Sequence, residues 1–153
     1  MEAGVIADAD GGLLNVHHTA RSYEDAGVVG IQMEDQEFPK KCGHTPFKRV
    51  VPVLDMVEKI RVACAARRNP EGMMLIARID ARQPEGFEAA MRRGEAYAEA
   101  GADIVFLEAL ESEAEMREES WLRLSGQSSA GDKFRSAGCR VLLPRIGWDE
   151  GRA

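Results

Sequence analysis

Short apolar segments alternate with segments of helical spacing along the first three quarters of the chain, and this alternation constrains the fold more than any other feature. The apolar segments, each expected to be a strand, lie at 4–7, 28–33, 73–77 and 104–107. Apolar residues recur with helical spacing at 15–26, 54–68 and 85–100, and another helix is predicted to start at Ser112 because Glu115 follows at capping-box distance. Strands that alternate with helices are parallel and joined by right-handed crossovers, so the sequence predicts an α/β fold.

Two α/β architectures fit this alternation. Four strand–helix units form either an open doubly wound sheet or half of an eight-unit barrel, which typically takes about 250 residues. The pattern alone does not separate them. Beyond about residue 120 the regular spacing stops, so we expect one α/β unit over 1–119 and an irregular segment over 120–153.

Composition narrows the classes of partner. The formal charge of −6 argues against nucleic acid and anionic membranes, because both require clustered Lys and Arg. No apolar run reaches the roughly 18 residues that span a bilayer, and the first residues lack the pattern of a secretion signal. We therefore expect a cytoplasmic protein with a small-molecule partner.

Charged residues stand at the carboxyl end of every predicted strand. They are Asp8, Asp10, Glu34, Asp35, Arg78, Asp80 and Glu108. Ligands of parallel α/β folds bind at that edge. Several carboxylates at one rim are costly without a cation, and oxygen donors select Mg²⁺ or Mn²⁺. The arginine adds a bidentate donor for a carboxylate or phosphate. A capping or ion-pairing role explains any one acid equally well, but recurrence at four strand ends favours a site.

A second candidate lies in the loop after the second strand, where the sequence runs Lys40-Lys41-Cys42-Gly43-His44. Two ammonium groups and an imidazole beside a thiol favour the thiolate, which makes the cysteine usable as an acid, base or nucleophile. An incidental cysteine in a solvated basic loop is the alternative. Its place on the same rim as the carboxylates favours the functional interpretation.

The remaining cysteines and histidines give weaker evidence for a functional site. The three cysteines, Cys42, Cys64 and Cys139, show no metal-type spacing and indicate neither a disulfide framework nor a zinc site. Cys64 falls inside a predicted helix and is expected to be packed there. His17 and His18 start a helix without a companion at metal-ligand spacing, so surface roles outweigh ligation.

These motifs together resemble those of the isocitrate lyase / phosphoenolpyruvate mutase superfamily. The resemblance extends over roughly 4–116 and is carried by five segments in the expected order, at 6–10, 30–36, 38–44, 77–81 and 100–106. The K-K-C-G-H motif is similar to that of the lyase branch, which includes 2-methylisocitrate lyase, and differs from the mutases. The resemblance implies a partial TIM (β/α)8-type barrel whose four units match strands three to six, and a homo-oligomer.

The resemblance also implies roles for individual residues. Asp8, Asp10 and Glu34 would hold Mg²⁺ (or Mn²⁺), whereas Arg78, Glu108 and Gly43 would contact the substrate. Cys42, assisted by Lys40 and His44, would be the catalytic acid. The implied reaction removes the proton of a 2-hydroxyl group, breaks a carbon–carbon bond to release a keto acid, and protonates the departing carbon.

Three functions stay open at this point. The first is a Mg²⁺-dependent carbon–carbon lyase acting on a 2-hydroxy di- or tricarboxylate, with a 2-methylisocitrate-like compound as the leading substrate. The second is a related oxaloacetate decarboxylase or hydrolase, or a phosphonate mutase. The third is an inactive remnant that binds at most Mg²⁺ or a carboxylate. Cys42 favours the first over the second.

Overall fold

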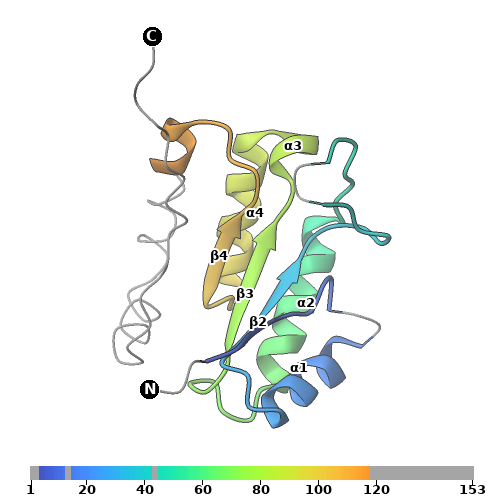
Figure 1. Ribbon diagram of the computed structural model, residues 1–153, viewed down its shortest axis with the longest axis vertical. Helices are drawn as coiled ribbons and strands as arrows, with labels where there is room; N and C mark the ends of the chain where they lie inside the picture. Colours follow the sequence, from blue (N-terminus) through green and yellow to red (C-terminus); the bar gives the residue numbers. More distant parts are fainter. Residues whose placement is uncertain (1–3, 13–14, 43–44, 118–153) are drawn as a thin grey trace.

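The computed structural model describes residues 4–12, 15–42 and 45–117, and these form one parallel sheet flanked by helices. In Figure 1 the labelled strands are arrows that point the same way. The elements in chain order are β1 (Ile6–Asp8), α1 (Val16–Asp25), β2 (Gly30–Glu34), α2 (Val53–Ala66), β3 (Met74–Ile79), α3 (Arg82–Glu85), α4 (Phe87–Glu99) and β4 (Ile104–Leu107).

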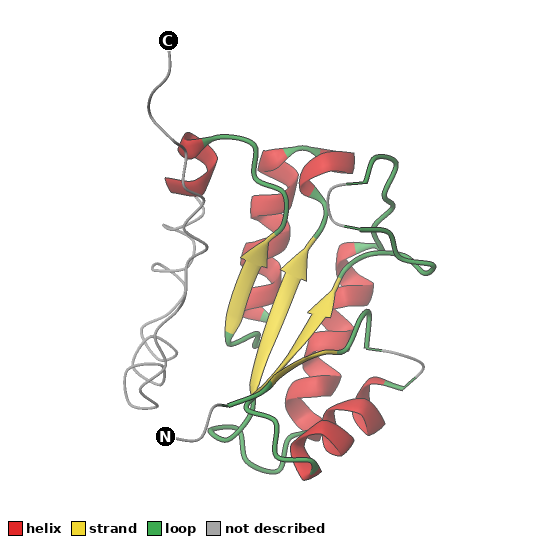
Figure 2. Ribbon diagram, in the orientation of Figure 1, coloured by secondary structure: helices red, strands yellow, loops and turns green. Residues whose placement is uncertain are grey.

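The strand order decides between the two architectures that the sequence left open. The four strands are hydrogen-bonded in the order β1-β2-β3-β4, and every neighbouring pair is parallel. Helices α2 and α4 lie together on one face of the sheet, and α1 packs against α2 (Figure 2). A doubly wound sheet reverses its order and has helices on both faces, whereas consecutive barrel units do neither. The described units therefore wind as barrel units do.

The hydrophobic core lies between the sheet and these helices. Side chains alternate along a strand, so every second strand residue faces the helices. The core-facing strand residues are almost fully buried and form one cluster: Ile31, Met33, Leu75, Ala77, Ile79, Val105 and Leu107. The residues between them, including Gln32, Glu34 and Arg78, face the opposite side of the sheet. This alternation directs polar side chains of neighbouring strands to one surface.

Most predicted elements are confirmed, with ends shifted by a residue or two. Asn15 caps α1 by accepting a hydrogen bond from the backbone N–H of His18 at 2.9 Å. The Ser112 hydroxyl accepts one from Glu115 N at 3.2 Å, as the capping spacing predicted. The helix expected over about 85–100 is confirmed as α4, whereas the short helix α3, separated from α4 by Gly86 at φ +90°, was not predicted. Glycine alone adopts that conformation without strain.

Some predictions fall outside the described residues. The irregular segment predicted over 120–153 lies there, as do Cys139, Gly43 and His44. Cys64 is half-buried in α2 and donates to the carbonyl oxygen of Gly101, as expected for a packed thiol. In the part of the chain that the structure describes, no helix has the length and hydropathy needed to span a bilayer.

Candidate active site at the carboxyl edge of the sheet

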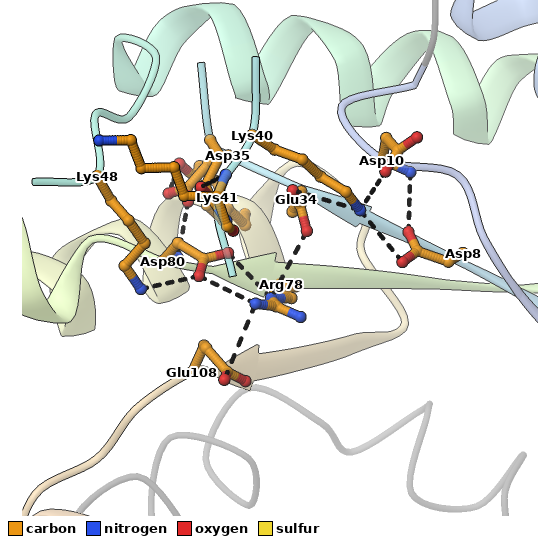
Figure 3. Close-up of polar contacts among 12 residues, drawn as sticks. Asp8, Asp10, Glu34, Asp35, Lys40, Lys41, Lys48, Arg78, Asp80 and Glu108 are labelled. Carbon is orange, nitrogen blue, oxygen red and sulfur yellow. Dashed lines mark hydrogen bonds and ion pairs between the residues drawn. The ribbon is translucent and has the colours of Figure 1, made fainter. Parts of the chain in front are cut away.

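The strand ends bring the predicted charged residues to one edge. Glu34 and Arg78 are register partners at the carboxyl ends of β2 and β3. The loop after β1 bends back toward β2, because Glu34 N donates to the carbonyl oxygen of Asp10 at 2.8 Å. Glu108 follows β4 and lies 3.9 Å from the guanidinium of Arg78. Side chains from four strand ends therefore share one surface (Figure 3).

Three carboxylates surround the ammonium group of Lys40. We call Asp8, Asp10 and Glu34 the acidic cluster. Lys40 Nζ contacts Asp10 Oδ1 directly and lies 3.4 Å from Asp8 Oδ2 and 3.8 Å from Glu34 Oε1. Figure 3 shows Lys40 reaching over from its loop to these residues. The hydrogen bond to Asp10, followed by the charges of the other acids, raises the pKa of Lys40.

Glu34 is the most unusual member of the acidic cluster. Its side chain is only 3% exposed, and Oε1 is buried without a hydrogen-bond partner among the described residues. Burial raises the pKa of Glu34, although the charges of Lys40 and Arg78 act in the opposite direction. A buried carboxylate oxygen without a donor is costly, and it is the kind of atom that a cation satisfies.

The acidic cluster supplies the donors that a hard divalent ion prefers. Carboxylate oxygens with no sulfur or nitrogen among them select Mg²⁺ or Mn²⁺. Within the described ranges, no three acidic, histidine or cysteine side chains already stand at metal-ligand spacing. The carboxylates are instead arranged around the Lys40 ammonium. The residues present fit a magnesium ion in donor type and in the unsatisfied Glu34 oxygen.

Arg78 is held in place by Asp80. Its Nε donates to Asp80 Oδ2 at 2.9 Å and its Nη2 to Asp80 Oδ1 at 3.1 Å. Burial alone would lower the pKa of Arg78, but the bonds to Asp80 and the nearby acids raise it, so the guanidinium stays charged. Arg78 is 17% exposed and Glu108 is 14% exposed. The predicted pair of substrate-contacting residues is therefore brought together.

The 36–50 loop carries the cysteine motif and leaves the sheet beside the acidic cluster. Cys42 is exposed. The sequence predicts two ammonium groups beside this thiol, but Lys40 binds the acidic cluster and Lys41 Nζ donates to the carbonyl oxygen of Phe47 at 3.0 Å. Both ammonium groups therefore bind oxygen acceptors rather than the Cys42 thiol. The third expected neighbour, His44, lies outside the described residues.

Sequence reasoning missed two polar residues that organise this loop. Gln36 is 5% exposed and brackets the Lys41 backbone, accepting from its N–H and donating to its carbonyl oxygen, both at 3.0 Å. Lys48 is buried and donates to Asp80 at 3.1 Å. Neither has a periodic signal in the sequence. The flanking residues do not reveal the burial of Lys48 either, because Phe47 is exposed and so is Arg49.

Two of the charged residues placed at the rim by sequence lie beneath it. Asp35 and Asp80 are both 0% exposed. Asp35 accepts from Asp80 N at 2.8 Å and from the Tyr97 hydroxyl at 3.0 Å, and it lies 3.4 Å from the Arg93 guanidinium. Burial raises the pKa of Asp35 to about 6, against the opposing effect of these donors. These two acids support the site from below.

Comparison with known proteins identifies relatives of this chain. A family described as phosphoenolpyruvate phosphomutase matches residues 1–120. 2,3-Dimethylmalate lyase of Eubacterium barkeri is 52% identical over 116 residues, which is 74% of this chain and 40% of that protein. 2-Methylisocitrate lyase of Aeropyrum pernix is 44% identical over 155 residues, 91% of this chain and 49% of that protein. The chain thus spans less than half the length of either relative.

Solved structures agree with the sequence relatives. A crystal structure of 2,3-dimethylmalate lyase superposes with a TM-score of 0.71 at 38% identity, covering 75% of this chain and 40% of that one. A phosphonopyruvate hydrolase in complex with oxalate and Mg²⁺ gives a TM-score of 0.66 at 35% identity, covering 79% of this chain and 43% of that one. The predicted α/β fold and the predicted resemblance are both confirmed. The chain belongs to the phosphoenolpyruvate mutase / isocitrate lyase family.

Proposed function

We propose that this chain carries the metal-binding, substrate-binding and acid residues of a Mg²⁺-dependent carbon–carbon lyase acting on a small 2-hydroxy di- or tricarboxylate. The single observation that carries the proposal is the buried Oε1 of Glu34, which has no hydrogen-bond partner among the described residues and belongs to a carboxylate between Lys40 and Arg78. Relatives named as lyases for 2,3-dimethylmalate and 2-methylisocitrate support this reaction class. A 2-methylisocitrate-like substrate is the leading candidate.

In this proposal Asp8, Asp10 and Glu34 hold the magnesium ion. The ion would supply positive charge that stabilises developing negative charge on a keto-acid product. The chain's own contribution is to present carboxylate oxygens at a carboxyl edge whose loops are fixed by hydrogen bonds, such as the one that the backbone N–H of Asp10 donates to Asp8 Oδ1 at 2.9 Å. The structure of a related phosphonopyruvate hydrolase contains oxalate and Mg²⁺, which supports the choice of magnesium as the metal.

Arg78 is proposed to bind a carboxylate of the substrate. The guanidinium is charged, mostly buried and oriented by Asp80, and these properties favour bidentate recognition of a carboxylate. Glu108, 3.9 Å from Arg78, would accept a hydrogen bond from a substrate hydroxyl. The predicted contact from Gly43 stays a prediction, because this residue lies outside the described ranges.

Cys42 is proposed to donate the proton that completes cleavage. When the carbon–carbon bond breaks, the electron pair stays on the departing carbon, and a proton from the thiol neutralises it there. The 36–50 loop starts and ends at the carboxyl edge, since Gln36 bridges to Val50, so Cys42 is carried on a segment anchored next to the site. Lys40, once a metal ion has displaced it from the acidic cluster, and His44 are proposed to assist by stabilising the thiolate that remains.

The test is release of a keto acid by the whole chain in the presence of Mg²⁺. Pyruvate would be measured from 2-methylisocitrate and 2,3-dimethylmalate, and glyoxylate from isocitrate, for the unchanged chain, Cys42→Ser and Cys64→Ser. We expect release that Cys42→Ser abolishes and that Cys64→Ser retains, because Cys64 is bonded within the fold away from the site. Activity that persists in Cys42→Ser would sink the assignment of the acid.

The alternative functions give different results in the same experiment. A hydrolase or decarboxylase of this family would act on oxaloacetate and leave the hydroxy acids unchanged, and a mutase would act on a phosphonate. An inactive remnant would release nothing. Binding of Mn²⁺, followed by electron paramagnetic resonance in the unchanged chain and in Glu34→Gln, then shows whether the acidic cluster still holds a divalent ion without catalysis.

A further inference from the structure

Lys48 is a buried cation that the proposed reaction does not use. Its side chain and that of Asp80 are both 0% exposed, and Lys48 Nζ donates to Asp80 Oδ1 at 3.1 Å. Figure 3 shows Lys48 and Arg78 approaching Asp80 from different sides. A buried ammonium is costly to desolvate and is retained only where a partner or a function compensates. Lys48 therefore lies close enough to influence the charge around Arg78, the arginine proposed to bind substrate.

Asp80 serves two cations at once. Its Oδ1 accepts from Lys48 at 3.1 Å and from Arg78 Nη2 at 3.1 Å, and its Oδ2 accepts from Arg78 Nε at 2.9 Å. The nearby carboxylate of Asp35 has its own counter-ion in Arg93, 3.4 Å away. We call Lys48, Asp80 and Arg78 the buried triad. Within it, one negative charge is shared between two positive charges.

The net charge of the buried triad determines how strongly Arg78 attracts an anionic ligand. Arg78 with Asp80 alone sums to zero (+1 − 1), so the arginine would attract an anion weakly. With Lys48 the triad sums to +1 (+1 − 1 + 1), and this added charge offsets part of the negative charge of Glu34 and Glu108, which lie 3.7 Å and 3.9 Å from Arg78. We propose that Lys48 is a positioning residue that neutralises Asp80 and so keeps the positive charge of Arg78 available for a substrate carboxylate. This inference rests on the proposed function, because it assumes that Arg78 binds a carboxylate.

Lys48 also has a second effect through its position in the chain. It lies on the returning side of the 36–50 loop, next to the backbone bond from Glu37 N to the carbonyl oxygen of Arg49 at 2.9 Å. Its bond to Asp80 therefore ties the base of this loop to the sheet. A purely structural role would consist of this tie alone. The two roles differ in what happens when the charge of Asp80 is removed together with that of Lys48.

The experiment measures binding of oxalate in the presence of Mg²⁺ by isothermal titration calorimetry. The variants are Lys48→Met, the double variant Lys48→Met/Asp80→Asn, and Arg67→Met as the control that removes a buried cation at the other end of the sheet. Far-ultraviolet circular dichroism establishes that each variant is folded. Lys48→Gln is measured as well, and replaces Lys48→Met if the latter does not fold, because glutamine keeps a donor for Asp80 and removes only the charge.

We expect Lys48→Met to weaken oxalate binding about tenfold, because one unit of charge close to a dianion is removed at low effective dielectric. The double variant should recover most of that loss, since Arg78 alone again gives +1. Arg67→Met should leave oxalate binding unchanged. If the double variant binds as weakly as Lys48→Met while Lys48→Gln, which keeps a donor for Asp80 without the charge, binds like the unchanged chain, the tie to the loop explains the effect and the electrostatic role is overturned.

Failure of this inference can be told apart from failure of the proposed function. Equal oxalate affinity in the unchanged chain and Lys48→Met overturns the inference alone. An unchanged chain that binds no oxalate with Mg²⁺ overturns both, because Arg78 and the acidic cluster would then not form a carboxylate site. Recovery in the double variant supports both.

Discussion

Lys40 contacts each carboxylate that we assign to the metal ion. An ammonium group at that position compensates the charge of the acidic cluster, whose members would otherwise repel one another. A cation that binds the same oxygens has to displace it. The neighbouring residue Lys41 carries the same charge but is bonded to a backbone carbonyl oxygen, so the two lysines form a matched pair for comparison.

Lys40→Met is expected to raise the affinity of the chain for Mn²⁺ by about tenfold, because a competing positive charge is removed from the acidic cluster. Lys41→Met should change the affinity little. The measurement is a titration of free Mn²⁺ by electron paramagnetic resonance. A lower affinity in Lys40→Met would mean that the ammonium organises the carboxylates for the metal and does not compete with it.

At the scale of single residues, the sequence located the acidic cluster and Arg78 but misjudged their neighbours. It grouped Asp35 with Glu34 because the two are adjacent. Side chains alternate along a strand, so Glu34 faces the site and Asp35 lies beneath it, bonded to Tyr97. The two-residue alternation of side chains along a strand would have predicted this difference from the sequence. The positions of Lys40 and Lys48 could not be predicted from the sequence, because they depend on how a long loop folds back over the sheet.

Among the elements, the 36–50 loop depends on one buried side chain. Gln36 holds the Lys41 backbone with two hydrogen bonds at 3.0 Å, and its own backbone bridges to Val50. An amide in this position takes the place of a neighbouring strand, because it offers one donor and one acceptor. The conformation of the segment that leads to Cys42 follows from these contacts.

Gln36→Ala is expected to increase trypsin cleavage after Lys40 and Lys41 by about fivefold or more, because local opening of a segment governs its proteolysis and the lost bonds are worth about 1 kcal/mol each. Cleavage after Arg117, outside the loop, serves as the internal control. Mass spectrometry of the fragments follows both sites. Equal acceleration at both sites would indicate global destabilisation and contradict a local role.

A contact between α1 and the end of α2 gives a prediction for pH. Glu24 accepts from the backbone N–H groups of Arg68 and Asn69, each at 2.9 Å. These two bonds favour the ionised carboxylate and lower the pKa of Glu24 below its usual 4.5. Because the pKa of Glu24 is lower in the folded chain than in the unfolded chain, its ionised carboxylate stabilises the fold at a pH above the unfolded-state pKa. This stabilisation is lost as the pH falls through the folded-state pKa.

Glu24→Gln should therefore lower the free energy of unfolding at pH 7, and the difference from the unchanged chain should disappear toward pH 3. Urea unfolding at pH 7, 5 and 3 measures this difference. Glu58→Gln, at an exposed position of α2, is the matched control and should show little difference at any pH. A difference that stays constant with pH would show that the charge of Glu24 is irrelevant.

The elements themselves were largely predictable, and the exceptions have physical causes. Apolar runs followed by acids located all four strands within two residues, because strands buried on the core face require apolar residues. The short helix α3 was missed, because its four residues are too few to show helical spacing, and Gly86 at φ +90° separates it from α4. A period reports which side chains are buried and does not report a local change of direction.

For the molecule as a whole, the two ends of the sheet have different tasks. The residues proposed to bind metal and substrate lie at the carboxyl end, whereas at the amino end Arg67 and Asp103 form an ion pair at 2.5 Å. Arg67 also donates to the carbonyl oxygen of Met73 at 2.8 Å, and Asp103 accepts from Leu75 N at 2.8 Å. This pair links the end of α2 to the starts of β3 and β4. Parallel α/β folds commonly separate stability from chemistry in this way.

Arg67→Met is expected to reduce the free energy of unfolding by about 3 kcal/mol, because a mostly buried carboxylate loses its counter-ion. The neighbouring Arg68→Met should cost under about 1 kcal/mol, because its pair with Asp25 is exposed to solvent. Chemical denaturation followed by circular dichroism compares the two. Similar costs for both variants would contradict the structural role of the amino-end pair.

The strand order has a consequence for how the chain is made. Each strand pairs with the one synthesised just before it, so a strand emerging from the ribosome meets a partner that already exists. For β2, β3 and β4 of the described residues, the pairing partner is the preceding strand, so this part of the sheet can grow in the direction of translation. Protease protection of stalled nascent chains should then appear stepwise, one strand–helix unit at a time. A chain with this strand order is expected to fold progressively from its N-terminal side during synthesis.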